Sequence, residues 1–144
     1  MPSARSHMIR RYGIDTSVLV RLLTGTPEAD YDACVERLSA LVTEEGAGVV
    51  ASNQVIGEAY VAVQHHYGVT RADARAGLLH VLRSGLVSPL NGRSVLDAIG
   101  STGGAGLLDR LIADGYTRED LDVLTLDEAM ASLPRVRILQ AGTA

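Results

Sequence analysis

Short apolar runs alternate along this chain with longer segments in which apolar residues recur every three or four positions. The short runs span only four or five residues, too few for buried helices, and they predict strands. The longer segments have the spacing of helices that bury one face. Strands are predicted at residues 10–14, 48–51, 86–90, 123–126 and 136–139, and helices at residues 17–23, 29–45, 53–67, 71–83, 93–99, 107–115 and 127–133.

Capping residues and glycines mark the ends of several predicted helices. Thr16 or Ser17 is the expected cap of the first helix, and Ser52 or Asn53 that of the third, because short polar side chains accept hydrogen bonds from free N–H groups. Gly68 is expected to end the third helix. Helical spacing in the second helix predicts a buried face made of Cys34, Val35, Leu38, Leu41 and Val42.

The order of these elements predicts the fold class. Strands that alternate with single helices or helix pairs favour an α/β fold, and 144 residues favour one domain. Because the chain has no Phe or Trp, its core must consist of Leu, Val, Ile and Ala, as in a parallel sheet covered by helices. We therefore expect a single doubly wound domain with a short parallel sheet of four to five strands flanked by helices.

The two ends of the chain carry separate expectations. Ser6-His7-Met8 resembles a cloning junction. We expect residues 1–7 to be a disordered or cloning-derived leader, residues 8–140 to form the domain and residues 141–144 to be a tail.

Composition excludes several classes of protein. No apolar run approaches the roughly 20 residues that cross a bilayer, and the start lacks the apolar segment of a secretory signal. The single cysteine, Cys34, cannot form an internal disulfide, which fits a cytoplasmic protein. All 13 basic residues are arginine, so a P-loop lysine and a Schiff-base lysine are both excluded. The net charge of −4 leaves no global basic surface for nucleic acid.

Four acidic residues lie in positions that suggest a site. Asp15 follows the first strand and Asp127 the fourth, Glu58 lies among apolar residues of the third helix, and Asp109 lies near the start of the helix at 107–115. A charge beside an apolar face needs a partner or a metal. If these carboxylates converge, their repulsion should raise the pKa of at least one, and a hard cation such as Mg²⁺ would neutralise them.

In four segments the chain resembles the PIN-domain family, and within it the VapC-type toxins of type II toxin–antitoxin pairs. The segments are I-D-T-S-V-L at 14–19, A-S-N-Q-V-I-G-E-A-Y at 51–60, G-L-L-D-R-L-I-A at 106–113 and V-L-T-L-D at 123–127. They follow one another in the order and at the spacing of the family. Together they extend over almost the whole chain.

The resemblance implies a Mg²⁺- or Mn²⁺-dependent endoribonuclease that acts as a toxin, forms a homodimer and is inhibited by a cognate antitoxin. Asp15, Glu58, Asp109 and Asp127 match the acidic quartet that binds the metal and catalyses hydrolysis of RNA. Thr16 and Thr125 match supporting hydroxyl positions. The charged segment at 115–122 and the glycine-rich segment at 100–106 depart from the family pattern, and they leave Asp97 as the alternative third acid.

Other functions compete with this hypothesis. A catalytically silent PIN-like binding or regulatory module is the main alternative, and the retained acidic quartet argues against it. A response-regulator receiver needs a lysine, which this chain lacks. A haloacid-dehalogenase-type phosphatase needs a second aspartate two residues after the first, where Ser17 stands.

Overall fold

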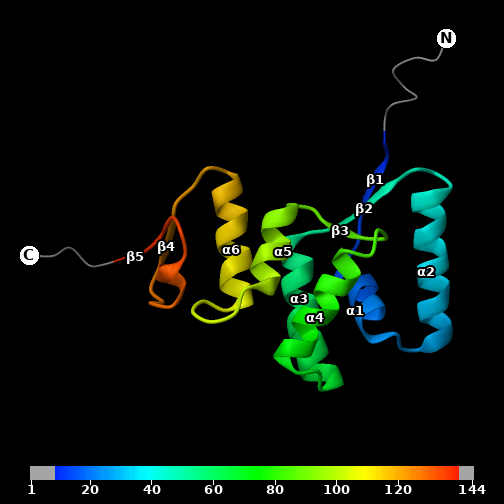
Figure 1. Ribbon diagram of the computed structural model, residues 1–144, viewed down its shortest axis with the longest axis horizontal. Coiled ribbons are helices and arrows are strands. Elements are labelled where there is room, and N and C mark those ends of the chain that lie inside the picture. Colours follow the sequence, from blue (N-terminus) through cyan, green and yellow to red (C-terminus); the bar gives the residue numbers. More distant parts are fainter. Residues whose placement is uncertain (1–8, 140–144) are drawn as a thin grey trace, which may run out of the picture. The chain divides into compact units, whose positions relative to one another are not determined.

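The computed structural model describes residues 9–139 (Figure 1). The predicted leader, Met8 and the predicted tail therefore lie outside the described residues. The chain forms two compact units, Met1–Leu90 and Asn91–Ala144, called here the N-terminal and the C-terminal unit. Both contain helices and parallel strands, so the α/β class is confirmed.

The N-terminal unit contains three parallel strands and four helices. β2 lies between β1 and β3, pairing Tyr12 with Val49 and Val50 with Ser88. α1 packs against α2, α3 and α4, and Figure 1 shows α2 alongside α1. The elements are β1 (Arg11–Gly13), α1 (Thr16–Thr24), α2 (Glu28–Thr43), β2 (Gly48–Ala51), α3 (Asn53–Tyr67), α4 (Arg71–Leu82) and β3 (Ser88–Pro89).

The C-terminal unit has a parallel pair of strands and two longer helices. β4 pairs with β5, α5 packs against α6, and a 3₁₀-helix contacts both strands. A single sheet of four to five strands is not confirmed, because the five strands form ladders of three and two. The elements are α5 (Arg93–Gly100), α6 (Leu107–Arg118), β4 (Val123–Thr125), the 3₁₀-helix η2 (Met130–Ser132) and β5 (Val136–Ile138).

Aliphatic side chains form the core of each unit, as the composition predicts. Leu19 of α1, Ile56 of α3 and Leu78 of α4 are completely buried. In the C-terminal unit, Ala113, Val123, Met130 and Val136 form a cluster against which Leu133 packs. No polar or charged residue within 9–139 is buried. None of the helices in this range is long and apolar enough to cross a membrane.

Several helix boundaries match the sequence pattern closely. α3 begins after Ser52, whose hydroxyl accepts a hydrogen bond from the Val55 N–H, and it ends at Gly68 in a left-handed conformation. Thr70 caps α4 in the same way as Ser52 caps α3. Short polar caps and a terminal glycine therefore determine these boundaries.

Three predictions about helices differ from the structure. In α2 none of the five residues of the predicted face is exposed, but only Leu38 is fully buried and the other four are half-buried, because α1 and β2 cover this face only in part. α6 continues through Gly115 to Arg118, and the chain leaves it at Asp120, which has a left-handed φ of 59°. Instead of a helix at residues 127–133 there is only η2.

Candidate functional site

Asp15 lies between β1 and α1 and is the N-cap of that helix. Its Oδ1 accepts hydrogen bonds from the Ser17 hydroxyl at 2.6 Å and from the Val18 N–H at 3.3 Å. The predicted caps, Thr16 and Ser17, are instead the first two residues of α1. Asp15 takes the cap position because its backbone is extended, with φ −96° and ψ −179°, which points the carboxylate back at the first turn.

Glu58 of α3 is linked to the start of α1 through Thr16. The Thr16 hydroxyl donates to Glu58 Oε1 at 2.6 Å, across 42 residues of sequence. The other carboxylate oxygen, Oε2, accepts a hydrogen bond from Gln54 Nε2 at 3.3 Å. Because α1 packs against α3, Asp15 and Glu58 lie in the same part of the N-terminal unit. The hydroxyls that bind them belong to Ser17 and Thr16, which are adjacent in the first turn of α1.

Hydrogen bonding lowers the pKa of both carboxyl groups. For Asp15 the main cause is the Ser17 hydroxyl, followed by the Val18 N–H, and for Glu58 it is the Thr16 hydroxyl, followed by Gln54. Donors of this kind stabilise the ionised form. Both side chains are exposed, so water solvates their charges as well. For these two groups the expectation of a raised pKa was wrong, and both stay ionised at neutral pH.

Asp109 and Asp127 belong to the C-terminal unit. Asp109 is half-buried in the first turn of α6, where the helix dipole favours a carboxylate. Asp127 is exposed, and its Oδ1 accepts hydrogen bonds from the N–H groups of Ala129 at 2.8 Å and Met130 at 3.2 Å. These contacts start a helical turn, but η2 ends before Leu133, whose extended backbone precedes Pro134 and stops the predicted helix. Thr125 Oγ1 accepts a hydrogen bond from the Asp127 N–H at 3.0 Å and so supports the same turn.

Asp97, the alternative third acid, lies on α5 and lines an open groove of about 420 Å³ in the C-terminal unit. Arg110 and Asp114 line the same groove. Arg110 donates from Nε to the Ala105 carbonyl at 3.0 Å and from Nη2 to the Gly103 carbonyl at 2.9 Å. This guanidinium therefore binds the glycine-rich segment. Asp114 accepts from Asn91 Nδ2 at 3.1 Å and from the Ser94 hydroxyl, and the sequence pattern gave no signal for it.

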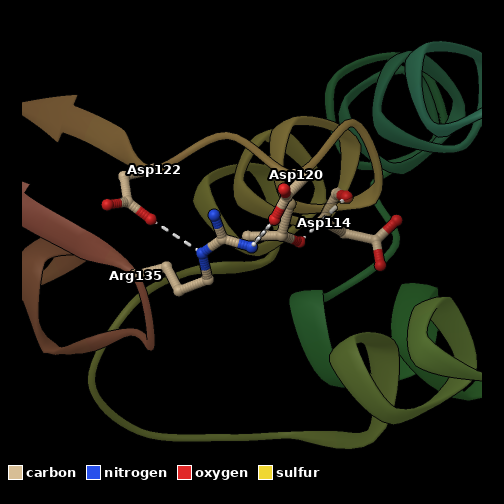
Figure 2. A network of polar contacts seen from close by, with 5 residues as sticks. Asp114, Asp120, Asp122 and Arg135 are labelled. Atoms are coloured by element: carbon tan, nitrogen blue, oxygen red, sulfur yellow. Dashed lines mark hydrogen bonds and ion pairs between the residues drawn. The ribbon is translucent and has the colours of Figure 1, made fainter.

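An ion-pair network in the same unit joins the end of α6 to the turn before β5. Figure 2 shows Arg135 between two aspartates, with Nε 2.7 Å from Asp122 Oδ1 and Nη1 3.0 Å from Asp120 Oδ1. The two carboxylates raise the pKa of Arg135, Asp122 more than Asp120. All three side chains are exposed to solvent, so the network makes a weak contribution to stability. It links the segment before β4 to the turn before β5.

The structure brings together part of the predicted quartet. Asp15 and Glu58 accept hydrogen bonds from the adjacent hydroxyls of Ser17 and Thr16 in the N-terminal unit, whereas Asp109 and Asp127 lie on α6 and after β4 of the C-terminal unit. Within residues 9–139 no group of three or more His, Cys, Asp or Glu side chains is placed to hold a metal ion. Comparison with protein-family models, curated proteins and solved structures finds no match.

Asp15 and Glu58 nevertheless present carboxylate oxygens, the kind of donor that binds a hard divalent cation. Mg²⁺ is commonly bound through one or two carboxylates and several waters. The hydrogen bonds that Asp15 accepts from the Ser17 hydroxyl and from the Val18 N–H both end on Oδ1. Among the ion pairs between residues 9 and 139, none includes either carboxylate. This donor set suits a hard, hydrated cation.

Proposed function

We propose that the protein is a metal-dependent endoribonuclease, the toxin of a type II toxin–antitoxin pair, with a doubly wound PIN-like fold. The observation that carries the proposal is the pairing of Asp15 and Glu58 through the first turn of α1. Both carboxylates are exposed, ionised and held by neutral donors. Two ionised carboxylates, each bound to one of two adjacent residues at the start of α1, suit a hydrated cation as their ligand.

In this proposal the acids hold Mg²⁺ or Mn²⁺ and order water near the scissile phosphate. When bound, the cation makes water a stronger nucleophile and offsets the phosphate charge. In the hydrolysis, the oxygen of water forms a bond to phosphorus and gives up a proton, the P–O bond to the leaving oxygen breaks, and that oxygen takes up a proton in exchange. Asp15 and Glu58, ionised at neutral pH, accept hydrogen bonds from that water. By the resemblance, Asp109 and Asp127 are further metal ligands, and Thr125 supports Asp127.

The negative net charge is consistent with this assignment. At −4 the protein repels RNA unless a cation or local arginines offset the charge. Cleavage of RNA by this protein should therefore depend strictly on a divalent cation. The alternative is a catalytically silent PIN-like module that binds without cleaving.

The test is an RNA cleavage assay on the purified chain with Mn²⁺, with Mg²⁺ and with excess EDTA. We expect cleavage with either cation and none with EDTA. Mn²⁺ should also raise the melting temperature, because at 100 times its dissociation constant a ligand adds about 2.7 kcal/mol of stability. Thermal stabilisation by Mn²⁺ without cleavage of any RNA would favour the silent module. If Mn²⁺ produces neither stabilisation nor cleavage, both functions are contradicted.

We further propose that the protein forms a homodimer, binds an antitoxin protein and acts in the cytoplasm. On α6, Leu108, Ile112 and Tyr116 are exposed by 42%, 49% and 49% and follow one another at four-residue spacing. An apolar stripe of this kind supports a protein interface, and twofold dimers are the commonest solution.

Sedimentation at micromolar concentration should give the mass of a dimer, and replacement of Ile112 by glutamate should give a monomer. A monomeric parent protein would contradict the proposed dimer.

A further inference from the structure

Glu58 is held at both carboxylate oxygens, from two different helices. Thr16 of α1 donates to Oε1 at 2.6 Å, and Gln54 of α3, one turn before Glu58, donates to Oε2 at 3.3 Å. The spacing of four residues places Gln54 and Glu58 on the same side of α3. Neither the sequence pattern nor the resemblance assigns a role to Gln54.

Two donors on opposite oxygens fix the plane of a carboxylate. Glu58 is exposed, and a long exposed side chain samples several rotamers that it must give up when it binds a ligand. With the Thr16 hydrogen bond alone, the Glu58 carboxylate could still rotate about that contact. The second contact, from Gln54, removes that freedom before any ligand arrives.

The chemistry of the second donor matters as well. A neutral amide holds the carboxylate without cancelling its charge, whereas an arginine at the same position would form an ion pair and compete with a cation. Gln54 therefore orders Glu58 and leaves its negative charge available.

We propose that Gln54 is a positioning residue that orders Glu58 for divalent-cation binding; this rests on the proposed function of the same site. Gln54 acts through Glu58 and lowers the ordering cost of binding. Its loss should weaken cation binding without unfolding the protein, because residue 54 is exposed in the first turn of a helix that Ser52 caps.

The experiment replaces Gln54 by methionine, which has nearly the same length and helix propensity but no N–H donor. Gln64→Met is the matched control, because Gln64 lies on the same helix and donates to the Tyr60 carbonyl at 2.9 Å. Ten residues separate the two glutamines, about 15 Å along the helix axis. Each full-length variant is titrated with Mn²⁺ in the absence of RNA, and the side-chain rotamers of Glu58, at χ2 as well as χ1, are measured from NMR scalar couplings.

We expect Gln54→Met to weaken Mn²⁺ binding about threefold to tenfold and to give rotamer-averaged couplings at Glu58. Gln64→Met should bind Mn²⁺ like the parent and keep one Glu58 rotamer. Parent-like Mn²⁺ affinity in Gln54→Met, or a single Glu58 rotamer in that variant, overturns the role of Gln54 alone. A parent protein that binds no Mn²⁺ overturns the proposed function together with this inference.

Discussion

Asp15→Asn is expected to reduce Mn²⁺-dependent RNA cleavage by at least about 100-fold, a loss typical of a group that moves or orders the reacting water. Asparagine keeps the side-chain oxygen that accepts from Ser17 and Val18, and it caps helices about as well as aspartate. The melting temperature of the metal-free variant should therefore stay close to that of the parent. Cleavage assays and thermal unfolding without metal measure the two effects separately.

Two comparison variants separate charge from capping at Asp15. Glu119→Gln neutralises an exposed carboxylate at the end of α6 and should change neither cleavage nor melting temperature. Asp15→Ala removes the charge and the cap, so it should lower both. If Asp15→Asn cleaves RNA as fast as the parent, Asp15 serves as a helix cap and has no part in the chemistry.

Leu19→Ala is expected to destabilise the protein by about 2–5 kcal/mol, the usual cost of removing a fully buried leucine side chain. Leu19 is completely buried on α1, the helix that packs against α2, α3 and α4. Urea unfolding measures the change. Ile9→Ala is the control, because Ile9 is 68% exposed and its truncation should alter stability by no more than about 0.5 kcal/mol. A loss below about 1 kcal/mol in Leu19→Ala would contradict the packing described for α1.

Secondary structure was predictable wherever the local sequence pattern of apolar runs, caps and glycines agrees with the packing. β2 and α3 follow the pattern because an apolar run, a serine cap and a terminal glycine all mark the same boundaries. α2 was harder because several apolar residues at helical spacing are only half-buried, and periodicity does not show how much of a face its neighbours cover. Glycine has a weak helix propensity, which predicts an end of α6 at Gly115, yet the surrounding helix continues through this residue to Arg118.

The candidate site was predictable only in part, because its residues have local sequence signals but their contacts depend on packing. Asp15 and Glu58 were identified from their sequence contexts, and a hydrogen bond across 42 residues now links them through Thr16. No pattern in the sequence specifies that Thr16 would bond to Glu58 while Ser17 bonds to Asp15, because that choice depends on how α1 packs on α3. The spacing of Gln54 and Glu58, four residues apart on a helix, is compatible with the hydrogen bond between their side chains, but spacing alone does not specify it.

The most direct test of the central claim, that Asp15 and Glu58 form a divalent-cation site, is paramagnetic line broadening by Mn²⁺. Amide resonances of the ¹⁵N-labelled protein are recorded while Mn²⁺ is added well below one equivalent. We expect the signals of Asp15, Thr16 and Glu58 to disappear first, while those of Asp32 and Glu36, two exposed acids four residues apart on α2, persist. Broadening that begins at Asp32 and Glu36, or that spreads evenly over the acidic residues, would contradict the claim.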